Sequence, residues 1–242
     1  MLASLGSSGW VGEKFGSEPL RVVALHGWGR TGHDFSRVLS GLDALALHLP
    51  GFGSASPPPV AWSSAQYADA LAEALEGRDP LVVVGHSFGG RIALRLAARH
   101  PRLVSHLILT GVPLTRVSAP PRQPVAFRVA KYLHAAKLIP EATMEKYRRR
   151  FGSSDYRAAE GVMRDILVRV IAEDYLEDAA RVTAPVTLVW GEADVPAPLA
   201  AAEKSMDYFP HATLRVVSGA GHLLEGNLEA ELARSVADAL SQ

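Results

Sequence analysis

The sequence predicts an α/β protein with a doubly wound, mostly parallel sheet and an inserted helical lid. Short apolar segments rich in β-branched residues alternate with segments of helical periodicity, up to residue 113 and again after residue 183. One of the strand-to-helix turns carries a Gly-x-Ser-x-Gly motif. Between residues 114 and 183 the pattern indicates helices alone. We therefore expect a core formed by residues 1–113 and 184–242 and a lid formed by residues 114–183.

Length and composition suit one globular core with an insertion. The 242 residues are 48% hydrophobic, and 25 Lys and Arg balance 25 Asp and Glu. A neutral chain favours neither nucleic acid nor a membrane as a partner. The chain has no cysteine, which excludes disulfides, a cysteine nucleophile and thiolate metal ligands. It has neither a membrane-length apolar run nor a basic leader at its start, so we expect a cytoplasmic protein.

The first part of the core contains three expected strands and two expected helices. The strands are expected at residues 10–15, 20–25 and 44–49 and one helix at 34–42. The loop His-Gly-Trp-Gly at 26–29 follows the second strand, and Pro-Gly-Phe-Gly at 50–53 follows the third. Ser63 and Gln66 have the spacing of a capping box, which predicts that an Ala- and Leu-rich helix begins there and continues to Glu76.

The Gly-x-Ser-x-Gly motif lies between a strand and a helix. Residues 81–84 are Leu-Val-Val-Val, a buried strand, and residues 91–100 are apolar at helical spacing. This is the context of a nucleophile elbow, in which a sharp, strained turn exposes the hydroxyl of Ser87. The N–H of Phe88, at the start of the helix, then points to where an oxyanion would form.

The rest of the chain continues the alternation around the lid. A strand at 104–110 ends the first half of the core. Prolines open and divide the lid, for which we expect helices at 125–138, 143–150 and 156–173. The core resumes with strands at 185–190 and 212–217 and helices at 198–208 and 227–240.

Three candidate catalytic residues each follow an expected strand. Ser87, Asp194 and His222 occur in this order, and the ends of parallel strands share one edge of a sheet. A serine nucleophile needs a base, the base needs a carboxylate that orients it, and the oxyanion needs donors. We therefore predict a triad of these residues, with the N–H groups of Trp28 and Phe88 as the oxyanion hole.

Other interpretations of the same residues remain open. His222 also fits a surface loop, and Asp194 lies in Gly-Glu-Ala-Asp, which is ordinary turn chemistry. Glu192 is the main competitor for the carboxylate role, and the glycines around Trp28 also suit a plain chain reversal. We expect His26 to form a hydrogen bond within its loop, and His86 to be structural or to line a pocket. The nine histidines form no His-x-x-x-His pair, so we expect no metal and no cofactor.

Five motifs together resemble the α/β-hydrolase-fold superfamily. They are His-Gly-Trp-Gly at 26–29, Pro-Gly-Phe-Gly-Ser at 50–54, Gly-His-Ser-Phe-Gly-Gly at 85–90, Trp-Gly-Glu-Ala-Asp at 190–194 and Gly-Ala-Gly-His at 219–222. The first two are similar to those of small carboxylesterases such as the pimeloyl-carrier methyl ester esterases, and also to meta-cleavage carbon–carbon hydrolases. Haloalkane dehalogenases and epoxide hydrolases of the superfamily use an aspartate at the elbow, so serine at position 87 argues against both. The lid carries no such resemblance.

The predicted function is a serine hydrolase that cleaves a carboxylic ester through an acyl-enzyme. A carbon–carbon bond hydrolase or a thioesterase with the same triad is the first alternative, and a non-catalytic small-molecule receptor on this fold is the second. The lid is polarised in charge, with nine Lys or Arg against two Glu over residues 116–150. This excess reflects either a solvated helix face that pairs with acidic residues 155–178, or a surface that steers an anionic or carrier-bound acyl substrate.

Overall fold

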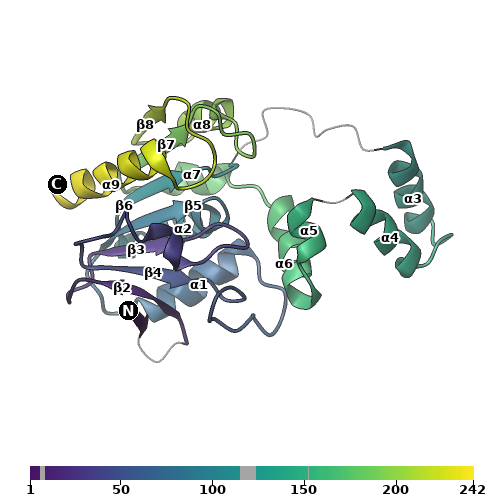
Figure 1. The fold of residues 1–242 in the computed structure, drawn as a ribbon, viewed down its shortest axis with the longest axis horizontal. Helices are drawn as coiled ribbons and strands as arrows, with labels where there is room; N and C mark the ends of the chain where they lie inside the picture. Colours follow the sequence, from purple (N-terminus) through teal and green to yellow (C-terminus); the bar gives the residue numbers. More distant parts are fainter. Residues whose placement is uncertain (6–8, 115–123, 152) are drawn as a thin grey trace.

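A mostly parallel sheet forms the centre of the protein. The computed structural model describes residues 1–5, 9–114, 124–151 and 153–242, and in this part of the chain eight strands form one sheet (Figure 1). The strands are β1 (Leu2–Ser4), β2 (Val11–Phe15), β3 (Val22–Leu25), β4 (Ala44–His48), β5 (Leu81–His86), β6 (Val104–Thr110), β7 (Val186–Gly191) and β8 (Ala212–Val217). Their order is β1-β2-β4-β3-β5-β6-β7-β8. Pairing is antiparallel from β1 to β4 through β2 and parallel elsewhere, which confirms the predicted fold class.

The central strands are mostly apolar because both of their faces are covered. All residues of β3, β4 and β5 are buried, as expected for parallel strands between two layers of helices. The register of β3 and β5 pairs Leu25 with Gly85. The loop that follows β3 therefore starts directly beside the turn that follows β5.

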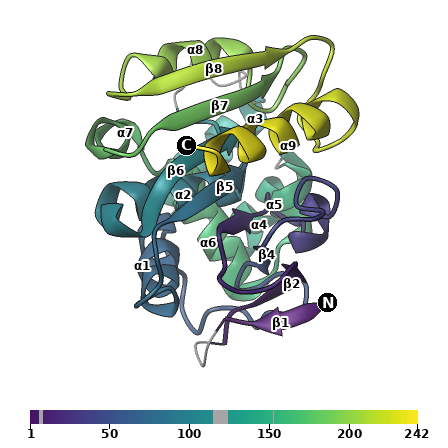
Figure 2. The ribbon, with the colours of Figure 1, turned by 90° about the vertical axis from the view of Figure 1, so that its left-hand side faces the viewer.

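Helices cover the two faces of the sheet (Figure 2). One face packs against α1 (Ser64–Ala74), α2 (Phe88–Arg99), α7 (Leu176–Arg181) and α8 (Leu199–Met206). The other packs against the 3₁₀ helix η1 (Gly32–Phe35) and α9 (Gly226–Leu240). A second 3₁₀ helix, η2 (Pro101–Leu103), precedes β6. Ser63 and Gln66 form the predicted capping box at the start of α1.

Two elements of the first part of the core differ from expectation. The helix expected at 34–42 is replaced by η1 and a run of turns, in which Leu39 N–H donates to the Phe35 carbonyl at 2.9 Å. Phe35, Val38 and Leu39 are buried, so single turns already satisfy the apolar spacing that predicted a helix. The short strand β1 was not predicted, because its three residues are too few for an alternating pattern.

Helices connect β6 to β7. They are α3 (Val125–Ala135), α4 (Glu141–Phe151), α5 (Ser154–Ala158), α6 (Gly161–Ala172) and α7. The single helix expected at 156–173 is divided where Ala159 and Glu160 adopt extended backbone and Gly161 has φ of +50°. Parts of the expected lid, residues 115–123 and 152, lie outside the described residues. No helix of the described chain is long and apolar enough to cross a bilayer.

The helices of this connection lie at different distances from the sheet. The hairpin of α3 and α4 stands apart from the core (Figure 1) and has its own apolar cluster of Phe127, Ala130 and Met144. By contrast, α6 packs on the core through Val162 and Met163. The side chain of Arg91 in α2 also donates to the Val170 carbonyl of α6 at 2.9 Å. Thus α6 is attached to the core, whereas the hairpin extends from it.

Candidate active site

The turn after β5 holds Ser87 in a strained conformation. Ser87 has φ of 51° and ψ of −111°, and it directly precedes α2. Its N–H donates to the Thr110 carbonyl at 3.0 Å, and the N–H of Gly89 donates to the His26 carbonyl at 2.9 Å. A Cβ atom on Gly85 or Gly89 would collide with backbone of the neighbouring segments. The glycines are therefore required for the sharp turn, which is the geometry expected of a nucleophile elbow.

Asp194 and His222 form a hydrogen-bonded pair. The Nδ1 atom of His222 lies 2.8 Å from Oδ2 of Asp194. The other carboxylate oxygen of Asp194 accepts the N–H of Ala197 at 2.7 Å. The side chain of Asp194 is 1% exposed and that of His222 is 19% exposed. A buried carboxylate at Nδ1 holds the proton there, which leaves Nε2 of His222 free to act as a base.

The end of β6 brings this pair beside the elbow. Thr110 accepts the N–H of Ser87, and the next residue, Gly111, has φ of +60°. A Cβ atom on Gly111 would lie 2.9 Å from ring atoms of His222 and 3.3 Å from Asp194. Among the hydrogen bonds of the described residues none joins Ser87 to His222, and such bonds often tighten only when substrate binds.

Gly111 is a site residue that the sequence analysis missed. In the sequence it only follows the strand expected at 104–110, although Gly-x-Pro directly after a strand indicates a special turn. Its role is steric, because only a residue without a side chain leaves room for the imidazole of His222.

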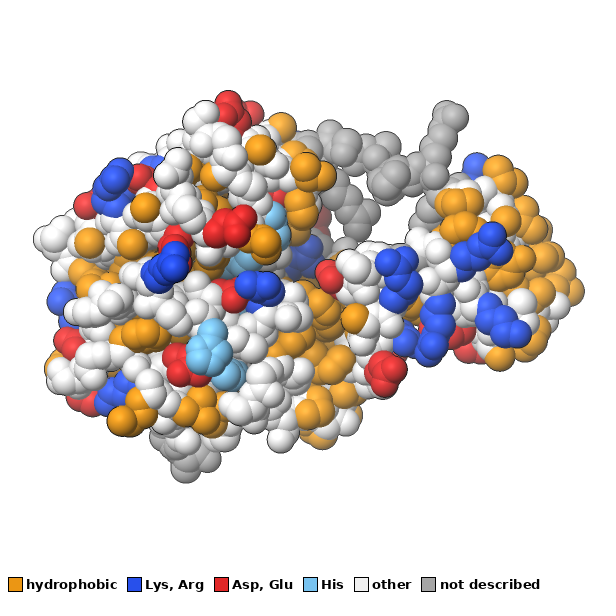
Figure 3. Space-filling model, viewed as in Figure 1, with side chains coloured by type: hydrophobic (Ala, Val, Ile, Leu, Met, Phe, Trp, Pro, Cys, Tyr) orange, Lys and Arg blue, Asp and Glu red, His pale blue; other side chains and the backbone are white. Residues whose placement is uncertain are grey.

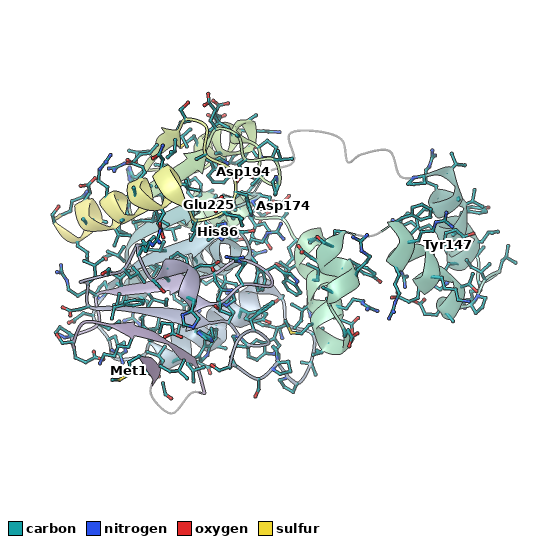
Figure 4. All side chains as sticks on the ribbon, viewed as in Figure 1. Met1, His86, Tyr147, Asp174, Asp194 and Glu225 are labelled. Carbon is teal, nitrogen blue, oxygen red and sulfur yellow. The ribbon has the colours of Figure 1, made fainter. Side chains whose placement is uncertain are left out.

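His86 contacts the pair from the other side. Its Nε2 lies 2.9 Å from the backbone carbonyl of His222, so it donates a hydrogen bond there. The two imidazole rings are 4.9 Å apart between centroids. Burial lowers the pKa of His86 to about 4, so the ring is neutral and Nδ1 carries no proton. Figure 4 shows His86 and Asp194 close together at this end of the sheet.

Two backbone N–H groups near Ser87 are free to bind an anion. In the described part of the chain, neither the N–H of Trp28 nor that of Phe88 donates to a protein acceptor. His26 positions the loop of Trp28: its Nδ1–H donates to the Gly27 carbonyl at 2.7 Å, and its Nε2 accepts the N–H of Leu49 at 3.0 Å. Burial lowers the pKa of His26 to about 4, which keeps the ring neutral for both bonds.

Aromatic side chains surround these N–H groups. The ring of Trp28 lies 4.9 Å from that of Phe52 and 5.2 Å from that of Phe88, both edge to face. Tyr67 contacts Phe88 at 5.5 Å, and its hydroxyl donates to the Pro50 carbonyl at 2.9 Å. An apolar surface next to an anion-binding position suits a substrate that has both an acyl chain and a carbonyl group.

Glu192 contacts different groups from those that Asp194 contacts. One of its carboxylate oxygens accepts the hydroxyl of Ser218 at 2.7 Å and the N–H of Gly219 at 3.1 Å. The hydrogen bond from Ser218 is the largest cause of the lowered pKa of Glu192. Glu192 thus supports the turn before His222, and Asp194 is the residue that contacts the imidazole.

Known proteins resemble the chain over most of its length. A model of the alpha/beta hydrolase family matches residues 22–234. The pimeloyl-[acyl-carrier protein] methyl ester esterase of Aromatoleum aromaticum is 31% identical over 232 residues, which cover 83% of this chain and 90% of that protein. Lipase LipV of Mycobacterium tuberculosis is 41% identical over 98 residues, only 38% of this chain and 37% of that lipase.

Solved structures share the fold. An esterase from Exiguobacterium antarcticum has a TM-score of 0.72 at 19% identity and covers 96% of each chain. A bromoperoxidase from Bacillus anthracis has a TM-score of 0.73 at 16% identity and covers 100% of this chain and 99% of its own. At such low identity these likenesses concern the fold alone.

Proposed function

Because the chain belongs to the alpha/beta hydrolase family and is a hydrolase of this fold, we propose that it is a serine esterase. The observation that carries the proposal is the Asp194–His222 pair beside the strained Ser87. We assign Ser87 as the nucleophile, His222 as the general base and acid, and Asp194 as the carboxylate that orients it. The N–H groups of Trp28 and Phe88 form the oxyanion hole.

The reaction has two halves. The hydroxyl of Ser87 attacks the ester carbonyl carbon while Nε2 of His222 takes its proton, and the resulting oxyanion accepts hydrogen bonds from the oxyanion hole. When the tetrahedral intermediate collapses, the bond to the alcohol breaks and His222 protonates the alcohol oxygen. Water then gives a proton to the same imidazole and attacks the carbonyl carbon of the acyl-enzyme. When this second tetrahedral intermediate collapses, the bond to Oγ of Ser87 breaks, His222 returns the proton to Oγ and the acid is released. Asp194 stabilises the imidazolium in both halves.

We further propose a carrier-bound or anionic acyl substrate. The relative with 31% identity is named for an ester on an acyl-carrier protein. The α3–α4 hairpin offers a matching surface, since residues 124–151 contain seven Lys or Arg against two Glu. Basic and hydrophobic side chains cover the hairpin in Figure 3. Such a surface attracts an acidic partner by long-range electrostatics.

The test combines labelling and turnover. A fluorophosphonate should label the wild-type protein and fail to label Ser87→Ala, whereas Ser241→Ala, at an exposed serine near the C-terminus, should be labelled normally. Removing a serine nucleophile lowers kcat by about 10⁶. A panel of p-nitrophenyl esters, acyl-thioesters and a vinylogous diketone should show ester cleavage as the fastest reaction.

Two results would contradict the proposal. Turnover by Ser87→Ala above a tenth of the wild-type rate would exclude Ser87 as the nucleophile. Faster cleavage of the thioester or the diketone than of any ester would keep the triad and reassign the reaction.

A further inference from the structure

A group of side chains outside the candidate active site has the composition of a metal site. Glu13 in β2, His33 in η1 and His48 at the end of β4 each offer one ligand atom, and these atoms all lie within 4.8 Å of one another. Among the described residues, one group of three histidines or carboxylates has its ligand atoms this close together, and it is this group. A search for local pairs such as His-x-x-x-His misses it, because the ligands come from three separate elements.

The sheet register explains why these residues meet. The antiparallel pairing of β2 and β4 places Glu13 opposite Ala46, and His48 lies two residues further along on the same face. That face is covered by η1, whose Gly32 packs so closely on β4 that a Cβ atom would collide with the Ala46 carbonyl. The close contact brings the neighbouring His33 over the same point of the sheet.

The two distances from Glu13 fit tetrahedral coordination. Oε1 of Glu13 lies 3.2 Å from Nε2 of His33 and 3.3 Å from Nε2 of His48. Ligands about 2.0–2.1 Å from a zinc ion are about 3.3 Å apart at the corners of a tetrahedron. Two of the three edges of the ligand set thus already have the length that zinc requires. We propose that Glu13, His33 and His48 bind a divalent transition-metal ion, with zinc as the best match.

The donor set and its exposure agree with this choice. Two imidazoles and one carboxylate suit zinc and its neighbours, whereas magnesium and calcium prefer sites made of oxygen alone. The side chains of Glu13 and His48 are 13% and 6% exposed, and that of His33 is 69% exposed. Two ligands are therefore held by the core, and the third lies at an open side through which an ion can enter.

The Ser54 hydroxyl is placed to accept the hydrogen bond that a ligating His48 would donate. When Nε2 binds a metal, the proton of the ring must sit on Nδ1 and needs an acceptor. The hydroxyl of Ser54 lies 3.3 Å from Nδ1 of His48 and can accept it. In the metal-free state the backbone N–H of Ser54, 3.2 Å away, donates to Nδ1 instead, and Nε2–H donates to Glu13. Metal binding thus requires a change of tautomer that the Ser54 hydroxyl permits.

The ion would connect three parts of the fold. It would join β2, η1 and β4 and, through Ser54, the loop that contains Phe52. The ring of Phe52 packs on that of Trp28. We therefore expect zinc to raise the thermal stability of the protein, because it binds the folded chain alone.

The experiment titrates EDTA-treated full-length protein with zinc by calorimetry and repeats the melting curve with and without zinc. Wild type should bind one zinc ion at this site and melt at a higher temperature. His33→Ala should lose that binding and the shift in Tm, and its exposed side chain makes misfolding no concern. His211→Ala, at another exposed histidine, should behave as wild type.

Ser54→Ala gives a sharper test of the geometry. It keeps the backbone N–H that serves the metal-free state and removes the acceptor that serves the bound state, so zinc affinity should fall about 10- to 100-fold. Magnesium at the same concentration should neither bind nor shift the Tm. Zinc binding that survives in His33→Ala, or that is lost equally in His211→Ala, would overturn the proposal. So would an unchanged affinity in Ser54→Ala.

Discussion

At the scale of single residues, the candidate site depends on glycines, which have no side chain, as much as on its polar residues. Gly85 and Gly89 allow the chain to turn back on itself, and a non-glycine residue such as Ser87 keeps its φ of 51° only because the surroundings impose it. Strain of this kind costs about 1–3 kcal/mol and is typical of functional positions. Gly111 plays the same permissive role beside His222.

We predict that Gly111→Ala disables the site without unfolding the protein. Its new methyl group would lie 2.9 Å from the imidazole of His222 and displace the ring. A displacement of about 1 Å at the reacting groups costs about 10²-fold in rate, so kcat should fall by about that factor. Gly41→Ala is the matched control, because Gly41 also has a positive φ, +79°, but open space around it. Equal kcat values for the two variants would refute the steric role.

We predict opposite outcomes for the two neighbouring carboxylates. Asp194→Asn favours the wrong tautomer of His222 and should lower kcat by about 10⁴. Glu192→Gln weakens only the turn at Ser218 and Gly219 and should retain most activity. Steady-state kinetics of both variants with one ester decide the matter, and a larger loss for Glu192→Gln would reverse the assignment.

Sequence reasoning at this scale is most specific where a motif carries its own context, as at the strained turn of Ser87. Ser87 could be proposed because a strand and a helix flank its glycines. The sequence predicts Asp194 as the carboxylate with Glu192 as its main competitor, because both follow the same strand. Only the fold shows that Asp194 is the one that contacts His222. Gly111 was missed because its function is defined by a ring that is distant in sequence.

At the scale of elements, prediction was best for buried strands and weakest for the connection between β6 and β7. Strands such as β5 are buried throughout and have one stable environment. The segment 156–173 has a continuous helical pattern, yet extended residues 159–160 divide it into α5 and α6. The division lets Arg164 of α6 reach Glu145 of α4 at 2.7 Å, a tertiary contact that no local pattern reveals.

The charges of the α3–α4 hairpin are partly neutralised. Arg148 pairs with Glu141, and Arg149 and Arg164 pair with Glu145. Two of these pairs lie within α4, and the third joins Arg164 of α6 to a glutamate of α4. Among the described residues no acid of 155–178 forms an ion pair with a cation of α3 or α4, so the pairing expected between the two halves of the connection is not the one observed. Lys137 and Lys146 are exposed and form no ion pair within the described residues, and the same holds for Arg128, Lys131 and Arg150, so these cations are available to an anionic partner.

We predict that replacing Lys137 and Lys146 with Gln affects anionic substrates alone. At low salt, kcat/KM for an anionic or carrier-bound ester should fall severalfold and its salt dependence should flatten, because steering charges act on association. A neutral ester should be unaffected. Arg102→Gln with Lys204→Gln removes two exposed charges elsewhere and serves as the control. Equal changes for both esters would leave the hairpin with no steering role.

At the scale of the whole molecule, stability depends on two imidazoles that the core keeps neutral. Burial lowers the pKa of His26 and of His86 to about 4, whereas an unfolded histidine titrates near 6.5. Between these values the unfolded chain binds protons that the folded chain does not. The free energy of unfolding therefore falls as the pH falls from about 6.5 towards 4.

We predict that His86→Gln makes this pH dependence shallower. As the pH falls from 7 to 5, each buried histidine should lower the free energy of unfolding by about 2 kcal/mol. Urea unfolding measures the free energy of unfolding of both proteins at a series of pH values. The variant should be less stable than wild type at pH 7, and this difference should shrink by about 2 kcal/mol at pH 5. His211→Gln, at an exposed site, should run parallel to wild type. A constant deficit for His86→Gln would mean that His86 does not carry the effect.

The helices from α3 to α7 leave the sheet after β6 and rejoin it at β7, and these two strands are neighbours. Such an arrangement allows the connecting helices to change in evolution while the sheet that carries the candidate catalytic residues stays the same. A lineage, or a laboratory recombination library, can exchange the connecting helices as a cassette while the pairing of β6 with β7 stays in register. Proteins made by such exchanges would keep Ser87, Asp194 and His222 and differ in the helices that connect β6 to β7. A search for variants that accept new substrates is therefore best directed at this cassette, with the sequence of the sheet kept unchanged.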